Sequence, residues 1–392
     1  MSKTDSAARL GAYITTSFGD ERVRAYVPRP LPPTPALRLE PLLSRIEDAN
    51  RALGRLDGVT SILPDPSLFI YMYVRKEALF SSQIEGTQSS LSDLLLFESA
   101  EAPGVPLDDV EEVSNYVAAM NFGLDRLRGG FPLSLRLIRE IHAVLLAKGR
   151  GSSKEPGEFR RTQNWIGGTR PGNAVFVPPP PDKIMECLDA FERFLHVQDK
   201  GLPTLIKAAL AHVQFETIHP FLDGNGRLGR LLITFLLVAE GALREPILYL
   251  SLFFKTHRQR YYDLLQKVRA EGDWESWLDF FLDGVSQTSN QAAETARVML
   301  ALFDADRAKI EGLGRPAASA LRVYHLIQKR PFLAIPAAAE GLKLSEPTVA
   351  KSVQHLMELG ILAETTGKMR KRLYVYTRYL DILSQGTEPL PR

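Results

Sequence analysis

The residues from His219 to Arg230 read His-Pro-Phe-Leu-Asp-Gly-Asn-Gly-Arg-Leu-Gly-Arg, and most of these residue types have a use at a phosphate group. Two glycines flank Asn225, and glycine permits the tight backbone in which successive N–H groups point the same way around an anion. Arg227 and Arg230 lie three residues apart in the first turn of a following helix, where the helix dipole already adds positive charge. Positive charges gathered in this way repel one another without a partner, whereas a bound polyphosphate would compensate them, so the arrangement indicates a polyphosphate site.

Two further side chains of this stretch could act on such a ligand. Asp223 supplies the carboxylate oxygen that a Mg²⁺ ion bridging phosphates prefers, and His219 supplies a base that titrates near neutral pH. A plain turn between helices with surface arginines is one alternative. A dinucleotide fingerprint is another, because the glycines also fit G-x-G-x-x-G and Glu245 follows about 20 residues on. That fingerprint needs a strand before its first glycine, whereas a helical pattern stands there.

Two helical patterns must position this stretch. Apolar residues recur at helical spacing from about Thr204 to Ile218, which predicts a buried helix. Pro220 ends this helix, because the residue before a proline is pushed out of the helical conformation, so His219 should lie at a helix end and face a cleft. The second helix should begin at the glycines and continue through Phe235.

A third helical pattern ends in an acidic residue. Asp65-Pro66 is a favourable helix start, and the pattern continues to Glu85, where Gly86 is a natural stop. Glu85 would lie in the last turn, where the helix dipole disfavours negative charge, and Ser81 precedes it by four residues on the same face. An exposed helix end is the plain alternative for this acidic residue.

The stretch from His219 to Arg230 matches the Fic family motif, HPFx(D/E)GNGRxxR, at every defined position, and Ser81 to Gly86 resembles the Fic inhibitory motif, (S/T)xxxE(G/N). Fic enzymes, which this chain resembles, are mostly helical proteins that transfer AMP from ATP to a hydroxyl group of a target protein. The resemblance implies that His219 deprotonates this hydroxyl and that Asp223 binds Mg²⁺. It also implies that the ATP-binding residues include Gly224, Asn225, Gly226, Arg227, Leu228, Gly229 and Arg230.

The resemblance implies a brake that involves Ser81, Glu85 and Gly86. A carboxylate brought to Arg230 would occupy the anion position that the γ-phosphate of ATP needs. ATP would then bind either not at all or with its α-phosphate turned from in-line attack. We therefore expect Glu85 to pair with Arg230 and to hold the enzyme inactive. De-AMPylation at the same site, with Glu85 positioning a water molecule, is an alternative activity.

Between the two motifs, residues 157–178 combine short β-prone runs with glycine, proline and asparagine, which predicts an irregular hairpin. This hairpin resembles the Fic flap, whose open edge holds the target segment by strand addition. Val175, Phe176 and Val177 would provide that contact. A surface hairpin that only covers the core is the alternative.

Aromatic residues that follow the motif resemble the Fic element R-x-x-Y-Y, which lines the nucleoside side of the site. Arg258, Tyr261 and Tyr262 are therefore candidates for contact with adenine or ribose. A place in the core is the alternative for both tyrosines. His257 stands where many relatives have asparagine.

The composition agrees with a globular protein. A chain of 392 residues, 45% hydrophobic and 24% charged, should hold two or three domains, and a net charge of +2 favours no particular partner. Cys187 is the single cysteine, which excludes a disulfide framework and fits a reducing cytosol. The longest apolar run, Leu231 to Ala239, is too short to span a bilayer, and no apolar signal core begins the chain. We expect a cytoplasmic protein without membrane association.

From Arg315 the residue pattern changes to one typical of a winged helix, which we place at 315–380. Residues 315–392 hold 12 Lys and Arg against 6 Asp and Glu, so this segment carries +6 and the rest of the chain −4. The asymmetry indicates weak DNA binding, whereas winged helices also serve in dimerisation and protein docking. The third helix should direct Thr348, Lys351, Ser352 and His355 outward, and the wing should carry Lys368, Arg370, Lys371 and Arg372.

These observations predict a mainly α protein: a Fic-type helical core with a short β-hairpin flap, plus the winged-helix domain. The predicted divisions are an extended proline-rich arm (1–36), an N-terminal helical region (37–150) with the inhibitory helix at about 66–86, and the catalytic core (151–300). The predicted function is a protein adenylyltransferase that uses ATP and Mg²⁺ and modifies a Ser, Thr or Tyr hydroxyl of a target or of itself. A DNA-binding regulator with a nucleotide-sensing Fic domain is the alternative from another class, and a homodimer is a further expectation.

Overall fold

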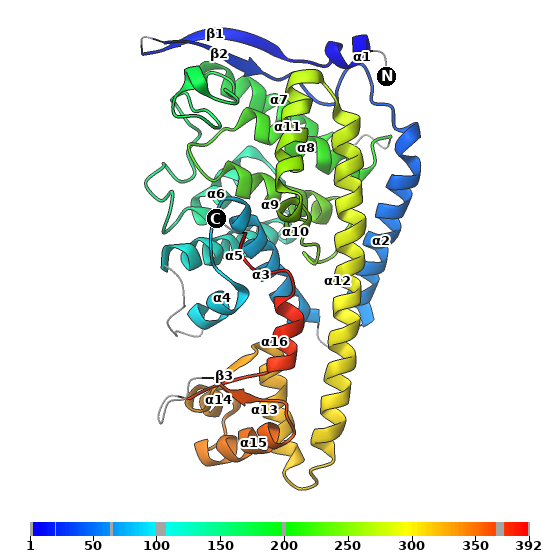
Figure 1. The fold of residues 1–392 in the computed structure, drawn as a ribbon, viewed down its shortest axis with the longest axis vertical. Coiled ribbons are helices and arrows are strands. Elements are labelled where there is room, and N and C mark those ends of the chain that lie inside the picture. Colours follow the sequence, from blue (N-terminus) through cyan, green and yellow to red (C-terminus); the bar gives the residue numbers. More distant parts are fainter. Residues whose placement is uncertain are drawn as a thin grey trace.

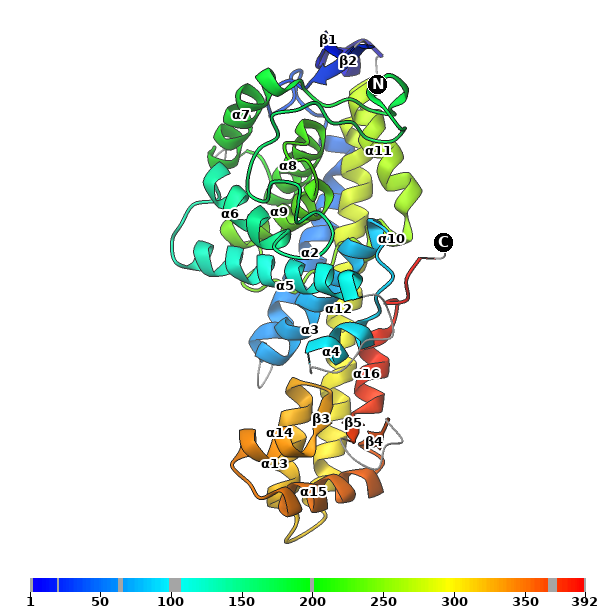
Figure 2. The same cartoon turned by 90° about the vertical axis from the view of Figure 1, so that its left-hand side faces the viewer.

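The computed structural model describes residues 3–19, 21–62, 66–98, 107–197, 201–365 and 372–390. It is mainly helical and elongated, with a main body, a smaller C-terminal unit, and a small N-terminal hairpin at the opposite end (Figures 1 and 2). None of the helices in these ranges is both long and apolar enough to cross a membrane.

The main body is built around two consecutive helices, α8 (Thr204–Ile218) and α9 (Asn225–Ala239), whose side chains are almost all buried. Because both helices are apolar around most of their circumference, they can only form at the centre of a helical cluster. The surrounding helices are α2 (Leu43–Ile62), α3 (Pro66–Ile84), α4 (Leu91–Glu98), α5 (Leu107–Arg128), α6 (Leu135–Leu145), α7 (Ile184–His196), α10 (Ser251–Thr256) and α11 (Arg258–Glu271). Three short 3-10 turns join them, at Glu40–Leu42, Pro171–Asn173 and Pro181–Lys183.

One long helix, α12 (Trp274–Glu311), extends from the main body to the C-terminal unit beside α2 (Figure 1). Asp273 caps its first turn by accepting a hydrogen bond from Ser276 N. The sequence-based division at residue 300 therefore falls inside a continuous helix. Asp306 of α12 is fully buried, and its Oδ2 accepts a hydrogen bond from the Tyr376 hydroxyl at 2.7 Å, so the helix also anchors the C-terminal unit.

The N-terminal residues differ from the single extended arm predicted for 1–36. They form a short helix, α1 (Lys3–Ala8), and an antiparallel hairpin of β1 (Ala12–Phe18) and β2 (Glu21–Val27). The hairpin buries Val23 and Ala25 against Val177, a contact across about 150 residues that local sequence patterns do not report.

The C-terminal unit contains α13 (Ala317–Lys329), β3 (Phe332–Ala334), α14 (Ile335–Leu342), α15 (Glu346–Glu358), β4 (Ala363–Glu364) and β5 (Leu373–Val375). Its antiparallel strands are arranged in the order β3-β5-β4. Lys351 is exposed on α15 as predicted, but Ser352 is buried, and its hydroxyl is satisfied by donating a hydrogen bond to Thr348 O of the preceding turn. Of the predicted wing residues, Lys368, Arg370 and Lys371 lie outside the described residues, as does Asp65.

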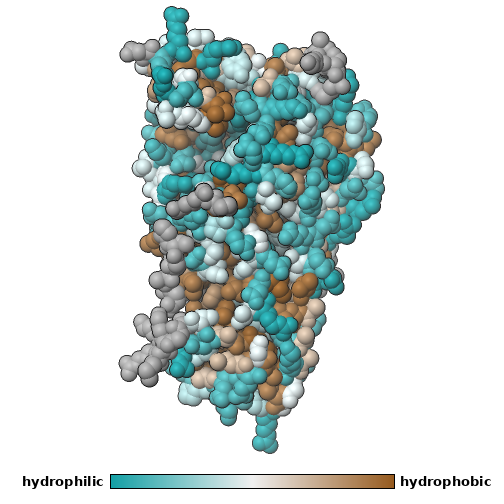
Figure 3. All heavy atoms as spheres, in the orientation of Figure 1, coloured by the Kyte–Doolittle hydropathy of each residue, from teal (hydrophilic) through white to brown (hydrophobic). Residues whose placement is uncertain are grey.

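The last described helix, α16 (Thr377–Ser384), returns the chain to the main body (Figure 2). Beyond it, Thr387 O accepts a hydrogen bond from Gln83 Nε2 at 2.9 Å, and Gly386 O accepts one from Lys255 Nζ at 3.2 Å. Figure 3 shows apolar residues gathered around the level of α16, where the C-terminal unit meets the main body. The end of α3 is therefore in direct contact with the C-terminal residues.

Candidate active site

A cavity of about 430 Å³ opens where α8 meets α9. It brings together Glu85, which directly follows α3, with residues from the α8–α9 connection, α11 and the segment around residue 166. Of the predicted site residues, the cavity is lined by Glu85, Val175, Phe176, His219, Asp223, Gly224, Asn225, Gly226, Arg227, Arg230, Tyr261 and Tyr262. Ser81, Gly86, Val177, Leu228 and Gly229 are not part of its lining.

His219 ends α8 in the left-handed conformation, with φ of 49°. This strained geometry is held from one side, because Arg160 Nε donates to His219 O at 2.9 Å and Asn164 Nδ2 donates to Phe221 O at 3.0 Å. Burial, together with the neighbouring cations Arg269 and Arg160, lowers the pKa of His219 to about 3. The imidazole is therefore neutral near pH 7 and able to accept a proton.

The connection from Phe221 to Asn225 is closed by the Asn225 side chain. Its Oδ1 accepts from Phe221 N at 2.9 Å, and its Nδ2 donates to Phe221 O at 2.8 Å. Asn225 is therefore a structural part of this loop, and the backbone N–H groups at the start of α9 are the donors that an anion in the cavity would meet. Within the described chain, the backbone N–H groups of Asn225, Gly226 and Arg227 have no acceptor, as expected at a helix N-terminus.

His142 supports the same loop from α6. Its Nδ1 accepts a hydrogen bond from Gly157 N at 2.8 Å, so Nε2 carries the proton and donates to Asp223 O at 3.0 Å. The ring also stacks on Phe221 with centroids 3.7 Å apart. Burial lowers the pKa of His142 to about 4, which keeps the ring in this neutral form.

Arg227 is buried against two carboxylates. Its Nη1 lies 3.2 Å from Oε1 of Glu112, and its Nη2 lies 3.6 Å from Oδ1 of Asp223. Glu112 belongs to α5 and is only 2% exposed, and its Oε1 also lies 3.0 Å from Nη2 of Arg150. The carboxylate of Glu112 therefore joins two arginines that line the cavity.

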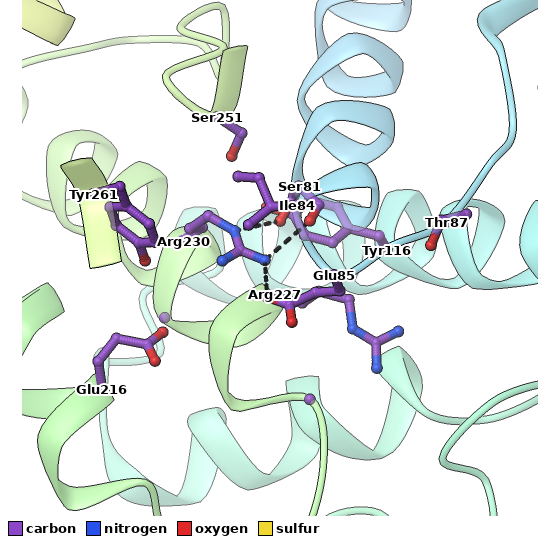
Figure 4. A network of polar contacts seen from close by, with 12 residues as sticks. Ser81, Ile84, Glu85, Thr87, Tyr116, Glu216, Arg227, Arg230, Ser251 and Tyr261 are labelled. Atoms are coloured by element: carbon purple, nitrogen blue, oxygen red, sulfur yellow. Dashed lines mark hydrogen bonds and ion pairs between the residues drawn. The ribbon is translucent and has the colours of Figure 1, made fainter. Parts of the chain in front are cut away.

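Arg230 is held by the end of α3, as Figure 4 shows. Its Nε donates to Ser81 Oγ at 2.8 Å, and its Nη2 donates to Ser81 O at 3.0 Å and to Glu85 Oε1 at 2.7 Å. The predicted contact between Glu85 and Arg230 is thus present. Burial would raise the pKa of Glu85, but Arg230, with Arg227 and Arg150, outweighs this effect and lowers that pKa below its ordinary value.

The carboxylate of Glu85 lies directly over the start of α9. A Cβ placed on Gly226 would collide with Glu85 Oε1 and would lie 3.1 Å from Arg230 Nη1. The glycine therefore leaves the space that the carboxylate fills. A phosphate oxygen at this position would contact the same donors, so a bound phosphate and the Glu85 carboxylate would exclude each other there.

Two other arginines bind backbone carbonyl groups at the C-terminal end of α3. Arg258 Nε donates to Ile84 O at 3.0 Å, and Arg150 Nη1 donates to Glu85 O at 3.3 Å. Cations at the C-terminal end of a helix stabilise it by compensating the helix dipole. Arg258, predicted to contact the nucleoside, is thus placed against the end of α3 and beside the Tyr262 ring at 5.4 Å.

Tyr261 and Tyr262, the two tyrosines predicted to contact the nucleoside, both lie on α11, but their surroundings differ. Tyr261 is 1% exposed, and His212 Nε2 accepts from its hydroxyl at 2.8 Å, which favours the alternative of a core residue. Tyr262 is 37% exposed and presents its ring to the cavity. Glu216 of α8 lies nearby, with an unpartnered buried Oε1 in the described structure, and burial raises its pKa to about 7.

The predicted flap is an irregular hairpin with one β-bridge, between Ile166 and Phe176. Val175 is 68% exposed at the cavity, whereas Phe176 is 4% exposed beneath the Arg269 guanidinium, 4.2 Å from the ring centroid. Val177 is also buried, and its carbonyl accepts a hydrogen bond from Tyr26 N at 2.9 Å. The strand edge at Val177 is therefore occupied by β2.

Asp223 is the only predicted metal ligand, and its side chain is 36% exposed at the cavity. One of its oxygens accepts from Gly224 N at 2.6 Å, and the other remains available. The described residues contain no group of three or more His, Cys, Asp and Glu side chains that could hold a metal alone. This fits a Mg²⁺ ion that takes most of its ligands from phosphates and water, and it does not fit a metal held only by protein.

Sequence reasoning assigned no role to Glu112, His142, Arg150 or Arg160. Glu112 lies in an acidic run that reads as a solvated helix face, and His142 reads as an ordinary helical histidine. Arg160 belongs to the run Glu-Phe-Arg-Arg-Thr-Gln-Asn, where closely spaced polar residues within a β-prone segment were the available signal. Arg160 is 2% exposed, and its hydrogen bond to His219 O supports that histidine from the protein interior.

Comparisons with known families agree with this geometry. Residues 43–125 match the family described as Fic/DOC family N-terminal, and residues 132–237 match the family described as Fic/DOC family. The second match includes α6, the flap, α8 and α9. These two segments, which include most of the residues that line the cavity, are therefore similar to the Fic/DOC family.

Particular relatives refine this placement. The Protein adenylyltransferase Fic of Aedes aegypti is 33% identical over 251 residues, which cover 63% of this chain and 44% of that protein. The protein of the same name from Culex quinquefasciatus is 34% identical over 210 residues, which cover 52% of this chain and 39% of that protein. The match thus spans less than half of the length of either relative.

Solved structures show the fold alone. A Fic family protein from Desulfovibrio desulfuricans superposes with a TM-score of 0.57 at 18% identity, over 87% of this chain and 97% of that chain. A Fic domain containing signaling protein from Bacteroides thetaiotaomicron gives a TM-score of 0.51 at 21% identity, over 64% of this chain and 95% of that chain.

Proposed function

We propose that this protein is a protein adenylyltransferase that transfers AMP from ATP to a Ser, Thr or Tyr hydroxyl of a target protein or of itself. One observation carries the proposal: a neutral histidine, the free N–H groups at the start of α9, and Arg227 and Arg230 all line one cavity. The names of the curated relatives support the same activity.

His219 would act as the general base. Its imidazole lines the cavity and is neutral near pH 7, so it has a ring nitrogen free to take the hydroxyl proton as the new bond forms. Arg160 and Asn164 fix the backbone that carries it, which keeps the ring at the mouth of the cavity. The hydroxyl oxygen would then attack the α-phosphate in line.

The start of α9 would bind the phosphates. Its free N–H groups and the two motif arginines all face the cavity, so they would contact the phosphates from the same side. They hold this arrangement without a ligand. Asp223 would hold a Mg²⁺ ion through its available oxygen. That ion would neutralise part of the phosphate charge.

Glu85 would keep the enzyme inactive. Its carboxylate takes the donor of Arg230 that the γ-phosphate needs, and it fills the space above Gly226. Because Ser81 also holds Arg230, the guanidinium stays in position when Glu85 leaves. The brake then competes with ATP without dismantling the anion site.

The flap would hold the target segment. With Val177 paired to β2, the free edge is the one formed by Trp165 to Gly167, whose outward backbone groups have no partner among the described residues. An extended target segment could add to this edge and present its hydroxyl to His219. Val175 would contact its side chains.

For the C-terminal unit we propose a winged helix. Its order of helix, strand, two helices and two strands supports this, as do Arg315, Lys351 and His355 around a surface hollow beside α15. Weak DNA binding at low salt remains our expectation, and a labelled duplex that shows none would remove it.

The test of the proposed function is transfer of label from ATP that carries it in the α-phosphate, with Mg²⁺. The parent chain, Glu85→Gly and His219→Ala would be compared on the protein itself and on a lysate. Label should increase in Glu85→Gly and vanish when His219→Ala is added. Absence of label in every variant despite ATP binding would contradict the proposal and favour a nucleotide sensor.

A further inference from the structure

Arg150 lies in the turn that follows α6, outside the family motif. Gly149 and Gly151 on either side have positive φ values of 68° and 87°, which glycine adopts readily. A Cβ on Gly151 would lie 2.9 Å from Asp223 Oδ2, so this turn passes closely over the anion-binding loop. The Arg150 side chain lines the cavity and is 48% exposed.

Arg150 and Arg227 share one carboxylate oxygen, Oε1 of Glu112, at 3.0 and 3.2 Å. Thr87 Oγ1 donates to the same oxygen at 3.1 Å, which fixes it further. A buried carboxylate that is bonded in this way holds the two guanidinium groups side by side. A guanidinium has five N–H donors, and among the described residues Arg150 donates only to Glu112 and Glu85, so further donors are available to the cavity.

Glu85 occupies two arginines at once. Its carboxylate bonds Arg230 at 2.7 Å, and its backbone carbonyl accepts from Arg150 at 3.3 Å. A movement that carries Glu85 away therefore frees donors of both arginines on the same side of the cavity. A long bond to a neutral carbonyl is weaker than a charge-assisted bond to phosphate, so Arg150 would favour the phosphate.

We propose that Arg150 is a third arginine of the anion site, which binds the terminal phosphates of ATP and then the departing pyrophosphate. This inference rests on the proposed function. In the transfer, a bond forms between the target hydroxyl oxygen and the α-phosphorus, and the bond from that phosphorus to the oxygen bridging to the β-phosphate breaks. The hydroxyl proton passes to His219, and the electron pair of the broken bond leaves with pyrophosphate, where Arg150 stabilises the charge.

The test compares calorimetric binding of ATP and AMP in Glu85→Gly with and without Arg150→Gln. ATP affinity should fall about tenfold while AMP affinity is unchanged, because AMP lacks the terminal phosphates. Arg150→Lys should restore part of the loss. Arg136→Gln, the matched change at a surface arginine of α6 that is 73% exposed, should alter neither affinity. Single-turnover transfer at saturating ATP should also slow in Arg150→Gln.

The outcomes distinguish a failure of the role of Arg150 from a failure of the proposed function. If Arg150→Gln keeps the ratio of ATP to AMP affinity while Glu85→Gly still transfers AMP, the role of Arg150 is overturned and the proposed function stands. An equal loss for both nucleotides, with a lower melting temperature, would overturn it in favour of a structural role. If Glu85→Gly itself binds no ATP, the proposed function fails and this inference with it.

Discussion

The two walls of the cavity are built in different ways. The anion wall, residues 219–230, is fixed at several points by buried side chains of other elements, among them Arg160, His142 and Glu112. The flap wall, residues 163–177, has a single β-bridge and an exposed Val175. The first wall has few alternative arrangements, whereas the second can adjust at low cost.

This difference fits the proposed partners of each wall. The triphosphate of ATP has the same chemical structure in every reaction, so a fixed set of donors can serve all of them without reorganising. A target segment varies in sequence, and a strand edge accepts it through backbone groups that every sequence shares. We therefore expect changes in the anion wall to affect every reaction, and changes at the exposed residues of the flap wall to affect only those with a target.

The largest effect should come from opening the loop of the anion wall. In the Glu85→Gly background, Asn225→Ala removes both bonds to Phe221 and leaves its buried N–H and C=O without those partners. Transfer to any acceptor should fall about 100-fold, as expected when reacting groups are displaced. Rates of α-phosphate label transfer measure this, and near-parental rates would show that the loop is not held by Asn225.

A smaller effect should follow from a charge on the flap. Val175→Lys places an ammonium where a target side chain would be buried, so target modification should fall about tenfold while ATP affinity is unchanged. Phe176→Lys is the contrasting variant, because its ring is buried beneath Arg269 and both properties should suffer. Equal loss of ATP affinity in Val175→Lys would contradict the separation of the walls.

The hairpin behind the flap offers a weaker change. Ala25 is fully buried in the small cluster that joins β2 to Val177, so Ala25→Glu should loosen the flap. Target modification should fall about fivefold, on the order of 1 kcal/mol, with ATP binding retained. Thr15→Glu, at an exposed position of β1, is the matched control. Identical rates in both variants would remove the hairpin from target binding.

The smallest effect concerns the pH dependence of folding stability, through Glu216 beside the anion wall. Burial raises the pKa of Glu216 to about 7, so the folded chain holds a proton that the unfolded chain releases above the ordinary carboxyl pKa. Folding stability should therefore fall as pH rises from 5 to 8. Glu216→Gln should reduce this decline by on the order of 1 kcal/mol, measured by urea unfolding at both pH values. An unaltered pH dependence would place the titration elsewhere.

Much of the anion wall could be predicted from the sequence, because its residues are neighbours along the chain. Pro220 and the following glycines specify a helix end, a tight turn and a helix start, and these appear at Ile218, His219 and Asn225. The contact between Glu85 and Arg230 was predicted from the inhibitory motif and is present. Its effect on activity remains a prediction.

The supports of these residues could not be predicted in the same way. Glu112 is buried only because α5 packs beside α9, and nothing in its acidic run distinguishes it from its exposed neighbours. The pairing of Tyr26 with Val177 depends on a sheet edge formed by distant residues. For Tyr261, the resemblance to the R-x-x-Y-Y element predicted a place near the cavity, but only the bond to His212 shows which way its hydroxyl points.

The hydrogen bond from Gln83 to Thr387 O bears on how the enzyme should be assayed. A shortened chain that ends at Glu311 would contain every residue that lines the cavity, and it would be a natural choice for isolating the catalytic part. It would also lack Gly386 and Thr387, whose carbonyl groups hold Lys255 and the end of α3. Rates measured on such a fragment would describe a protein in which the helix that carries the proposed brake has already lost one of its supports.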